Sequence, residues 1–232
     1  RKTLLLVPVM KYYKQMGFKL EEMQEMLGGN TYQFLQQNFH SKISGLKDME
    51  REIQGSLAAV KDWYELIKEA ELVIRHKIQD VSVRFIDPAS YCYMDQDFNY
   101  QYMESIINIS WTNYLEAAGQ KITGPVILNF SSAAHKMSGT CTRARIMQKA
   151  VWADPEDPAQ IMWGGRMAAC AYHVGGYEDM GQVYEKILKW ADMRGYACDQ
   201  GCFERYVIDY WTTRSSSEVV REVIVTVSPR SG

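Results

Sequence analysis

The stretch from residue 32 to residue 73 constrains the fold more than any other part of the chain. It contains no proline, and its apolar side chains recur at alternating steps of four and three residues. Eight of the nine positions on this seam are apolar: Phe39, Ile43, Leu46, Glu50, Ile53, Leu57, Val60, Tyr64 and Ile67. A heptad seam of about four repeats predicts one long helix that takes part in a coiled coil. A partner within the chain would fit, but the flanking helices are short, so we expect a homodimer that covers the stripe.

The regions on either side of this helix follow different patterns. Residues 4–27 have the spacing of two short helices, separated at Gly17. After residue 78, alternating apolar residues predict strands, and helical spacing returns twice. The predicted elements are a strand at 81–93, a helix at 99–118, strands near 125–131 and 140–152, then a strand at 165–174, a helix at 178–194, and strands at 202–212 and 219–227.

The two series share a signature that indicates an internal duplication. In each, a helix that carries a tryptophan, Trp111 or Trp190, ends at a glycine, and a second glycine precedes the next strand. The acidic, proline-containing segment at 153–158 reads as a loop between the halves. The sequence therefore predicts two copies of a βαββ unit.

Composition excludes several classes of protein. The formal net charge is −2, so this chain offers no basic surface for nucleic acid. We expect neither a membrane span nor a signal peptide, because the longest apolar run is short and contains Pro8. The five cysteines form no Cys-x-x-Cys pair and the four histidines are scattered, so we expect reduced thiols in the cytoplasm, no metal site and no cofactor.

Residues 17–27 resemble the end of the DNA-binding domain in MerR-family transcription regulators, where a Gly-Phe pair precedes a short acidic and apolar helix. Lys19 stands where that family often has a Ser or Thr helix cap, which is a small departure. The resemblance implies that the winged-helix reader of DNA precedes Arg1, so that this chain is a fragment of a longer protein. Promoter DNA would be bound through that part, and RNA polymerase would be affected indirectly.

Three later motifs resemble the GyrI-like effector-binding domain of the BmrR-like, multidrug-sensing branch of the same family. They are Tyr172-His-Val-Gly-Gly-Tyr177 before a helix, Gly195-Tyr196, and Glu204-Arg-Tyr-Val-Ile-Asp209. The resemblance implies an α+β fold, with a long dimerisation helix in an antiparallel coiled coil and then a duplicated βαββ domain with an antiparallel sheet. It divides the chain into a remnant of the DNA-binding domain at 1–30, a dimerisation helix at 31–76 and the effector domain at 77–232.

Glu204 is the strongest single candidate for a ligand contact. It lies in an apolar stretch beside Phe203, where an ionised carboxylate needs a cationic partner to offset its desolvation. By resemblance, Glu204 matches the acidic residue at the bottom of the drug pocket in GyrI-like sensors. A cationic ligand can supply the partner, and the alternative is a structural ion pair with Arg145 or Arg166.

Aromatic residues supply the rest of the predicted site, because ring faces attract cations by about 0.5–2 kcal/mol each. Period-two alternation places Glu204, Tyr206 and Ile208 on one strand face. The predicted ligand-binding residues are Glu204, Tyr206, Tyr177, Tyr172, Tyr91, Tyr93, Trp111 and Trp163. Each ring fits core packing equally well. Arg143 and Arg145 alternate on a strand and would instead suit an anionic ligand.

Three functions compete. The leading one is a ligand-responsive regulator that catalyses nothing and binds a small, lipophilic, aromatic and cationic effector, which biases a dimer that distorts promoter DNA. The second is enzymatic, since some GyrI-like proteins are similar to hydrolases that open cyclopropane rings with a Glu and a Tyr, here Glu204 and Tyr206. The third is a pure protein-interaction module, which a complete lack of binding to aromatic ions would indicate.

Overall fold

The computed structural model describes residues 2–28, 31–177 and 179–230, with side chains from residue 7 onward. Positions 1, 29 and 30 of the first predicted part, and 178, 231 and 232 of the last, lie outside the described residues. The chain forms two compact units, Arg1–Gln54 and Gly55–Gly232. The functional division at residues 30 and 76 stays a prediction.

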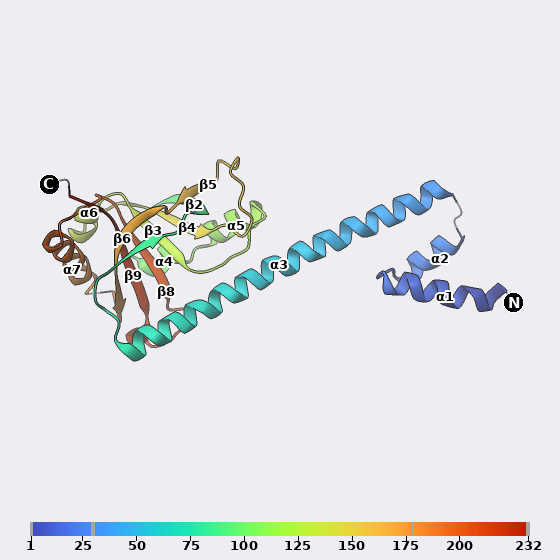
Figure 1. The fold of residues 1–232 in the computed structure, drawn as a ribbon, viewed down its shortest axis with the longest axis horizontal. Helices are drawn as coiled ribbons and strands as arrows, with labels where there is room; N and C mark the ends of the chain where they lie inside the picture. The colour runs from blue at the N-terminus through green and yellow to red at the C-terminus, as the bar shows by residue number, and fades with distance from the viewer. Residues whose placement is uncertain (1, 29–30, 178, 231–232) are drawn as a thin grey trace. The chain divides into compact units, whose positions relative to one another are not determined.

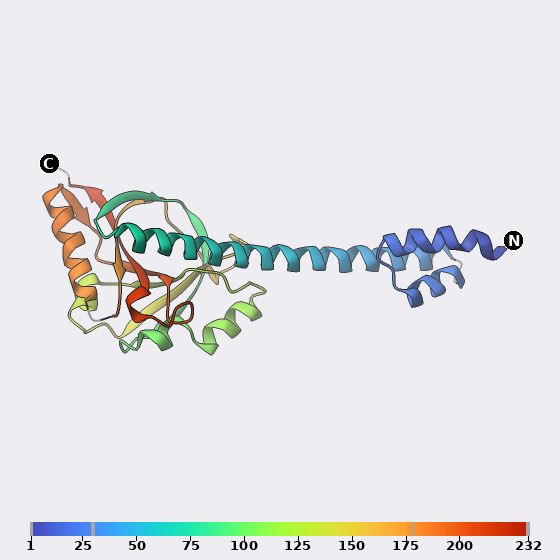
Figure 2. The same ribbon diagram turned by 90° about the horizontal axis from the view of Figure 1, so that it is seen from below.

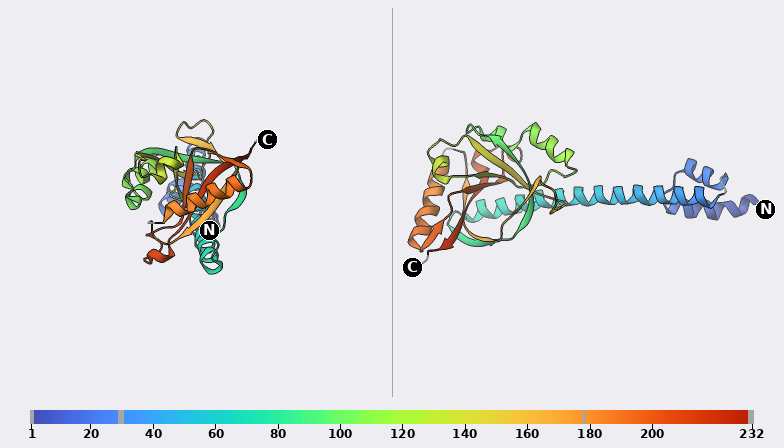
Figure 3. Two further views of the ribbon diagram at one scale, coloured as in Figure 1. Left: turned by 90° about the vertical axis from the view of Figure 1, so that its left-hand side faces the viewer. Right: turned by 90° about the horizontal axis from the view of Figure 1, so that it is seen from above.

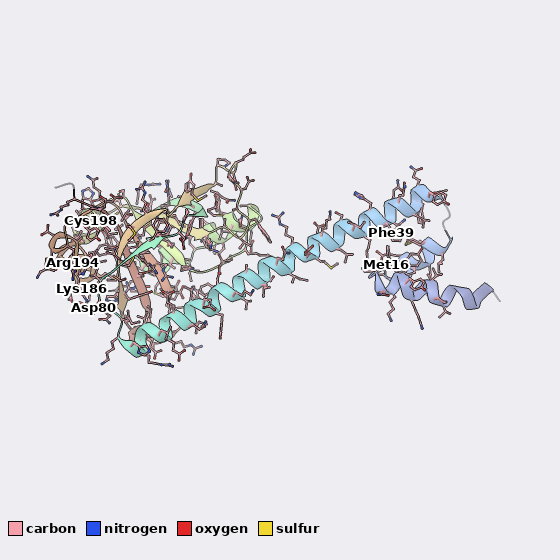
Figure 4. The ribbon with its side chains drawn as sticks, viewed as in Figure 1. Met16, Phe39, Asp80, Lys186, Arg194 and Cys198 are labelled. Carbon is pink, nitrogen blue, oxygen red and sulfur yellow. The ribbon has the colours of Figure 1, made fainter. Side chains whose placement is uncertain are left out.

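The first unit contains α1 (Lys2–Gln15), α2 (Leu20–Gly28) and the beginning of α3 (Tyr32–His76). Gly17 has a φ of 80°, a conformation that favours glycine and that separates α1 from α2 as predicted. Phe18 and two methionines of α2 form the buried core, and Phe39 packs against them (Figure 4). The ring centroids of Phe18 and Phe39 lie 5.4 Å apart. Phe39, which we expected in the dimer seam, therefore belongs to the core of this unit.

The second unit is built on a curled antiparallel sheet (Figures 1 and 3). Its strands are β1 (Ser82–Ile86), β2 (Ala89–Asp97), β3 (Val126–Phe130), β4 (Arg143–Lys149), β5 (Gln160–Trp163), β6 (Arg166–Val174), β7 (Tyr196–Cys198), β8 (Cys202–Ile208) and β9 (Val220–Pro229). Their order is β1-β6-β9-β8-β3-β4-β2-β5, and β7 pairs with the end of β9.

The strand order confirms the predicted duplication. In the first half β4 lies between β2 and β3, and in the second half β9 lies between β6 and β8. The halves join where β3 pairs with β8, with Leu128 opposite Glu204. At the two edges the halves exchange strands, because β1 pairs with β6 and β5 pairs with β2. The α+β fold with an antiparallel sheet is thus confirmed.

Helices cover one face of this sheet: α4 (Tyr102–Ile106), α5 (Ile109–Ala117), α6 (Ala133–Met137) and α7 (Met180–Met193). The main core lies between them and the sheet, and its largest members include Trp111, Tyr184, Phe130 and Ile187. Asp80, before β1, forms an ion pair of 3.3 Å with Lys186 of α7 (Figure 4). We call this side of the sheet the covered face.

The last turns of α3 pack on the opposite face, which we call the open face, beside β8 and β9 (Figures 1 and 2). Leu66, Ala70 and Val73 are buried there against Val207 and Val220. The predicted seam is a different stripe of the same helix. The apolar side chains of the seam, from Ile43 to Ile67, remain 44–67% exposed.

Three predicted elements are interrupted. The strand expected at 81–93 is two strands, because Pro88 has no N–H to continue a ladder. The helix expected at 99–118 breaks before Asn108, whose side chain accepts the backbone N–H of Trp111 at 2.7 Å and caps α5. Ile109, the first residue of α5, is 77% exposed. The strand expected at 202–212 ends at 208, and a register irregularity after Tyr206 turns Ile208 toward α3 rather than toward the core.

The prediction also missed four short elements: α6, β5, β7 and the 3-10 helix η1 (Ser216–Glu218). None of the helices in the described part of the chain combines the length and the apolar character that crossing a bilayer requires.

Candidate functional site

Glu204 lies on the covered face and is fully buried, as its apolar surroundings predict. Its carboxylate accepts hydrogen bonds from the hydroxyls of Tyr184 at 2.7 Å and Tyr206 at 2.8 Å. The ammonium of Lys136, from α6, lies 2.8 Å from the same carboxylate. The cation that Glu204 needs is therefore supplied by the chain itself. It is neither Arg145, which pairs with Asp95, nor Arg166, which lies near Asp199.

Lys136 is enclosed by aromatic rings. Its side chain is 3% exposed, and its Nζ donates to the Tyr102 hydroxyl at 2.7 Å. The Nζ lies 4.9–5.8 Å from five ring centroids, those of Phe98, Tyr100, Tyr102, Phe130 and Tyr184. Ring faces and a carboxylate together form an environment that favours a cation.

The pKa shifts in this cluster follow from burial and from the Glu204 charge. Burial alone would lower the pKa of Lys136, but Glu204 and Tyr102 outweigh that effect, and the pKa lies above its usual value. Burial raises the pKa of Tyr184 and Tyr206 well above the usual value, and the Glu204 charge adds to the shift. At neutral pH the side chain of Lys136 is thus an ammonium, and the hydroxyls of Tyr184 and Tyr206 are neutral.

The eight predicted site residues do not gather in one cleft. Tyr206 and Glu204 are together, and Tyr177 joins them through Tyr102, on whose ring it stacks at 4.5 Å. Trp111 is buried in the core under α5 and stacks on Tyr114.

Tyr93 lies near the sheet edge, and its ring is covered by the Arg145 guanidinium at 4.4 Å. The remaining three, Tyr172, Tyr91 and Trp163, lie on the open face.

Two hollows flank Trp163 on the open face, and we call them together the groove. The larger has a volume of about 400 Å³ and lies toward Phe203 and Arg166. The smaller has about 230 Å³ and is lined by Tyr91, Arg205 and Glu69 among others. Trp163 contacts Tyr91 edge to face at 5.2 Å and Phe203 at 4.7 Å, as ring centroids.

The turn before β6 fixes the position of Trp163. Gly164 has a φ of 112°, and a Cβ there would lie 2.4 Å from the backbone oxygen of Asp87. Gly165 donates its backbone N–H to the oxygen of Ile86 at 2.7 Å. The two exchanged edges of the sheet therefore meet at this turn, which closes the groove on one side.

Four charged side chains form a chain across the floor of the groove. Arg205 pairs with Glu222 at 2.6 Å and, through both terminal nitrogens, with Glu69 of α3. Arg84 also pairs with Glu222, at 2.7 Å, and the Tyr172 hydroxyl donates to Glu69 at 2.7 Å. The pKa of Arg205 is raised, because these carboxylates outweigh the effect of its burial. The chain of charges links the groove directly to α3.

Sequence reasoning missed Lys136, Glu222 and the link between Arg205 and Glu69. Glu222 carried a usable signal, since it stands in the apolar run of β9 just as Glu204 does in β8. Lys136 gave none, because it lies in a short loop helix that is too short to show an apolar period. Its burial depends on where the loop lies in the fold.

Within the described residues, no group of three or more histidines, cysteines or carboxylates is placed to hold a metal ion. Burial raises the pKa of Cys92 to about 11 and that of Cys202 to about 12, so both are thiols at neutral pH.

A curled sheet with an aromatic groove, built on duplicated halves and attached to a long helix, defines a small-molecule-binding domain. Residues 95–228 match the family of GyrI-like small molecule binding domains, and this is more than half of the chain. The chain belongs to the GyrI-like family. That part of the resemblance seen in the sequence is confirmed.

Solved structures show the same fold. The cryo-electron microscopy structure of an EcmrR–DNA complex in EcmrR-RPo is 14% identical, with a TM-score of 0.53 over 98% of this chain and 84% of that chain. The crystal structure of the EcmrR C-terminal domain is 17% identical, with a TM-score of 0.54 over 65% of this chain and 98% of that one. A hydrolase from Listeria innocua is 11% identical over 68% of this chain and 98% of that chain, with a TM-score of 0.48. Among curated proteins, no sequence matches the chain.

Proposed function

We propose that this chain is the ligand-sensing and dimerising part of a MerR-type transcription regulator of the BmrR-like branch. Its effector is a small, lipophilic, aromatic cation that binds in the groove beside Trp163. One observation carries the proposal: the smaller hollow is lined both by Trp163 and by Glu69, which belongs to α3. An effector in this hollow contacts the dimerisation helix itself.

The preference for an aromatic cation rests on which rings are free. The chain's own cations already cover the rings of Tyr93 and Tyr177. Among the described side chains, no lysine or arginine lies over Trp163, Tyr91 or Phe203. These rings can therefore stack on a flat ligand and attract its positive charge, and Glu69 adds a carboxylate at the wall.

The apolar stripe of α3 supports a homodimer. Four apolar side chains of the seam are about half exposed or more, although they lie on the helix that also packs on the sheet: Leu57, Val60, Tyr64 and Ile67. An apolar stripe of this length is covered in a stable protein, and a second α3 offers the matching heptad surface. We propose the antiparallel arrangement that the family resemblance implies.

Signal transfer follows from the charge chain. A cation near Glu69 competes with Arg205 for its carboxylate, and this changes how firmly α3 is held against the sheet. In the parent protein α3 leads back to a winged-helix part, so the change would alter promoter DNA and, indirectly, RNA polymerase in the cytoplasm.

The experiment is a calorimetric titration of the protein with tetraphenylphosphonium. Neutral triphenylphosphine oxide is the uncharged comparison. We expect Trp163→Ala to weaken binding about fivefold to thirtyfold, since a stacked cation–ring contact contributes about 1–2 kcal/mol. Tyr93→Ala is the matched control, because Arg145 already covers that ring. Equal affinity for the cation and the neutral compound, or no effect of Trp163→Ala, would remove the groove as a cation site.

The hydrolytic alternative gains no support from the geometry. Glu204 and Tyr206 are buried and hydrogen-bonded to each other, and the Glu204 carboxylate is also paired with Lys136, so both groups are already engaged within the fold.

A further inference from the structure

Arg221 of β9 is a buried cation without a counter-ion. It is fully buried, and it lies opposite Tyr206 of β8, so its side chain is on the covered face. Among the described residues, no carboxylate lies within ion-pair distance of its guanidinium. We propose that Arg221 and the Tyr177 hydroxyl form a binding site for a small carboxylate, distinct from the groove and from the Glu204 pair.

Three hydrogen-bond donors at this place are buried and unused. The Nε and Nη1 of Arg221 and the hydroxyl of Tyr177 have no hydrogen-bond partner among the described residues. The guanidinium carbon lies 4.1 Å from the centroid of the Tyr177 ring, so these donors are neighbours. Buried N–H and O–H groups are nearly always bonded, so the three donors require an acceptor that the described part of the chain does not supply.

The missing acceptor should carry a negative charge. An arginine remains a cation wherever it lies in a protein, so burial cannot neutralise it as it can neutralise a lysine. Two buried carboxylates act on the charge of this region, and both are engaged. Glu204 pairs with Lys136, and Asp209 accepts the backbone N–H of Trp211 at 3.0 Å. A buried water would satisfy the N–H groups but would leave the charge uncompensated.

A second arginine of the sheet shows the complete arrangement. Arg145 lies over the ring of Tyr93 at 4.4 Å, much as Arg221 lies over its own tyrosine. There the carboxylate of Asp95 accepts two hydrogen bonds from the guanidinium, of 2.7 and 2.9 Å. A planar carboxylate matches the plane of a guanidinium, so it also fits beside the ring on which the guanidinium is stacked. Arg221 lacks the group that Asp95 supplies to Arg145, and a small carboxylate ligand has that chemistry.

The segment between β6 and α7 covers the site. The Nη2 of Arg221 donates to the backbone oxygen of Gly175 at 3.0 Å and to that of Gly176, and it lies 3.3 Å from the Nδ1 of His173. The other two nitrogens can therefore bind a ligand while Nη2 holds the segment. A carboxylate that fixes the guanidinium should also fix residues 175–177.

The test follows thermal unfolding of the chain in sodium acetate. Sodium chloride at equal ionic strength is the reference, and acetamide is the neutral isostere. We expect acetate to raise the melting temperature saturably, whereas acetamide should leave it at the chloride value. Arg221→Met should abolish the rise that is specific to acetate. The matched control, Arg145→Met, should keep it, because Asp95 rather than a ligand is the partner of that arginine.

Tyr177→Phe tests the site without changing its charge. Because the Tyr177 hydroxyl has no partner among the described residues, this variant should be about as stable in chloride as the unchanged chain. It should need about tenfold more acetate to reach half of the stabilisation, since a hydrogen bond to a charged group contributes roughly this factor. Hydrogen exchange of the amides at 175–177 should slow in acetate and not in acetamide.

Three results would overturn the proposal: no acetate-specific rise in the unchanged chain, an equal rise in Arg221→Met, or the same half-saturation in Tyr177→Phe. Each would mean that the unused donors bond only to buried water. If Arg221→Met does not fold, the half-saturation of Tyr177→Phe decides. None of these measurements depends on Trp163, so the groove and this site can fail separately.

Discussion

Replacing Arg205 with methionine removes the central charge of the groove while keeping an apolar stem of similar length. In the unchanged chain the Arg205 side chain is 13% exposed and bridges Glu222, which is 1% exposed, to Glu69. Breaking a buried pair costs about 3–5 kcal/mol, because the remaining charge stays in a poorly solvated place. Glu222 keeps Arg84 and Glu69 keeps Tyr172, so we expect the lower end of that range, about 3 kcal/mol.

A second arginine provides the control. Arg145 forms two hydrogen bonds to Asp95, of 2.7 and 2.9 Å, but the two side chains are 34% and 48% exposed. Such a pair contributes about 0–1 kcal/mol, since water already solvates both charges. Arg145→Met and Arg205→Met therefore remove the same chemical group, in the first case from an exposed pair with one carboxylate and in the second from a buried bridge between two.

The assay is urea unfolding followed by circular dichroism, at one fixed protein concentration because a homodimer shifts the apparent stability. The two variants should differ by about 2 kcal/mol, roughly thirtyfold in the folding equilibrium. Restoring neutrality with Arg205→Met/Glu222→Gln should recover part of the loss. If Arg205→Met is no less stable than Arg145→Met, burial does not control the strength of this pair, and the reasoning about the groove charges is wrong.

Three further predictions test other parts of the molecule. Leu57→Glu places a charge in the exposed seam of α3 and should give monomers in analytical ultracentrifugation. The control Lys61→Glu should leave the dimer intact. If the chain without substitutions is already a monomer, this prediction is wrong. The pKa of Tyr206 is raised in the folded state, so its hydroxyl contributes its full share of the folding free energy below the unfolded pKa near 10, and this share is lost as the pH rises further. Tyr206→Phe should therefore make the alkaline loss of stability shallower, and an unaltered profile of stability against pH would refute this. Gly164→Ala combines a positive φ with a backbone clash and should cost more than about 1 kcal/mol, with altered fluorescence of Trp163; a stable variant with native fluorescence would contradict it.

Much of the fold was predictable because periodicity is a local property. The four-three spacing through Leu46 and Leu57 predicted α3, and the tryptophan–glycine signature predicted two βαββ halves, which the strand order confirms. The breaks at Pro88 and Asn108 also had local signals in the sequence: Pro88 has no N–H for a strand ladder, and Asn108 is a residue type that caps helices. The apolar pattern around these two residues continued past them, and it predicted one strand and one helix where the structure has two of each.

The candidate site was predictable only in part. The buried position of Glu204 and its need for a cation followed from the sequence alone, since an apolar strand offers a carboxylate nothing else. Which cation fills that need, and which aromatic rings face a hollow, depended on the tertiary structure. Lys136 reaches Glu204 because a loop helix lies over β8, and Trp163 meets Tyr91 because the sheet edges exchange strands. Alternation fixes the face on which a side chain lies, but its partner comes from a distant segment whose position is set by the packing of the whole domain.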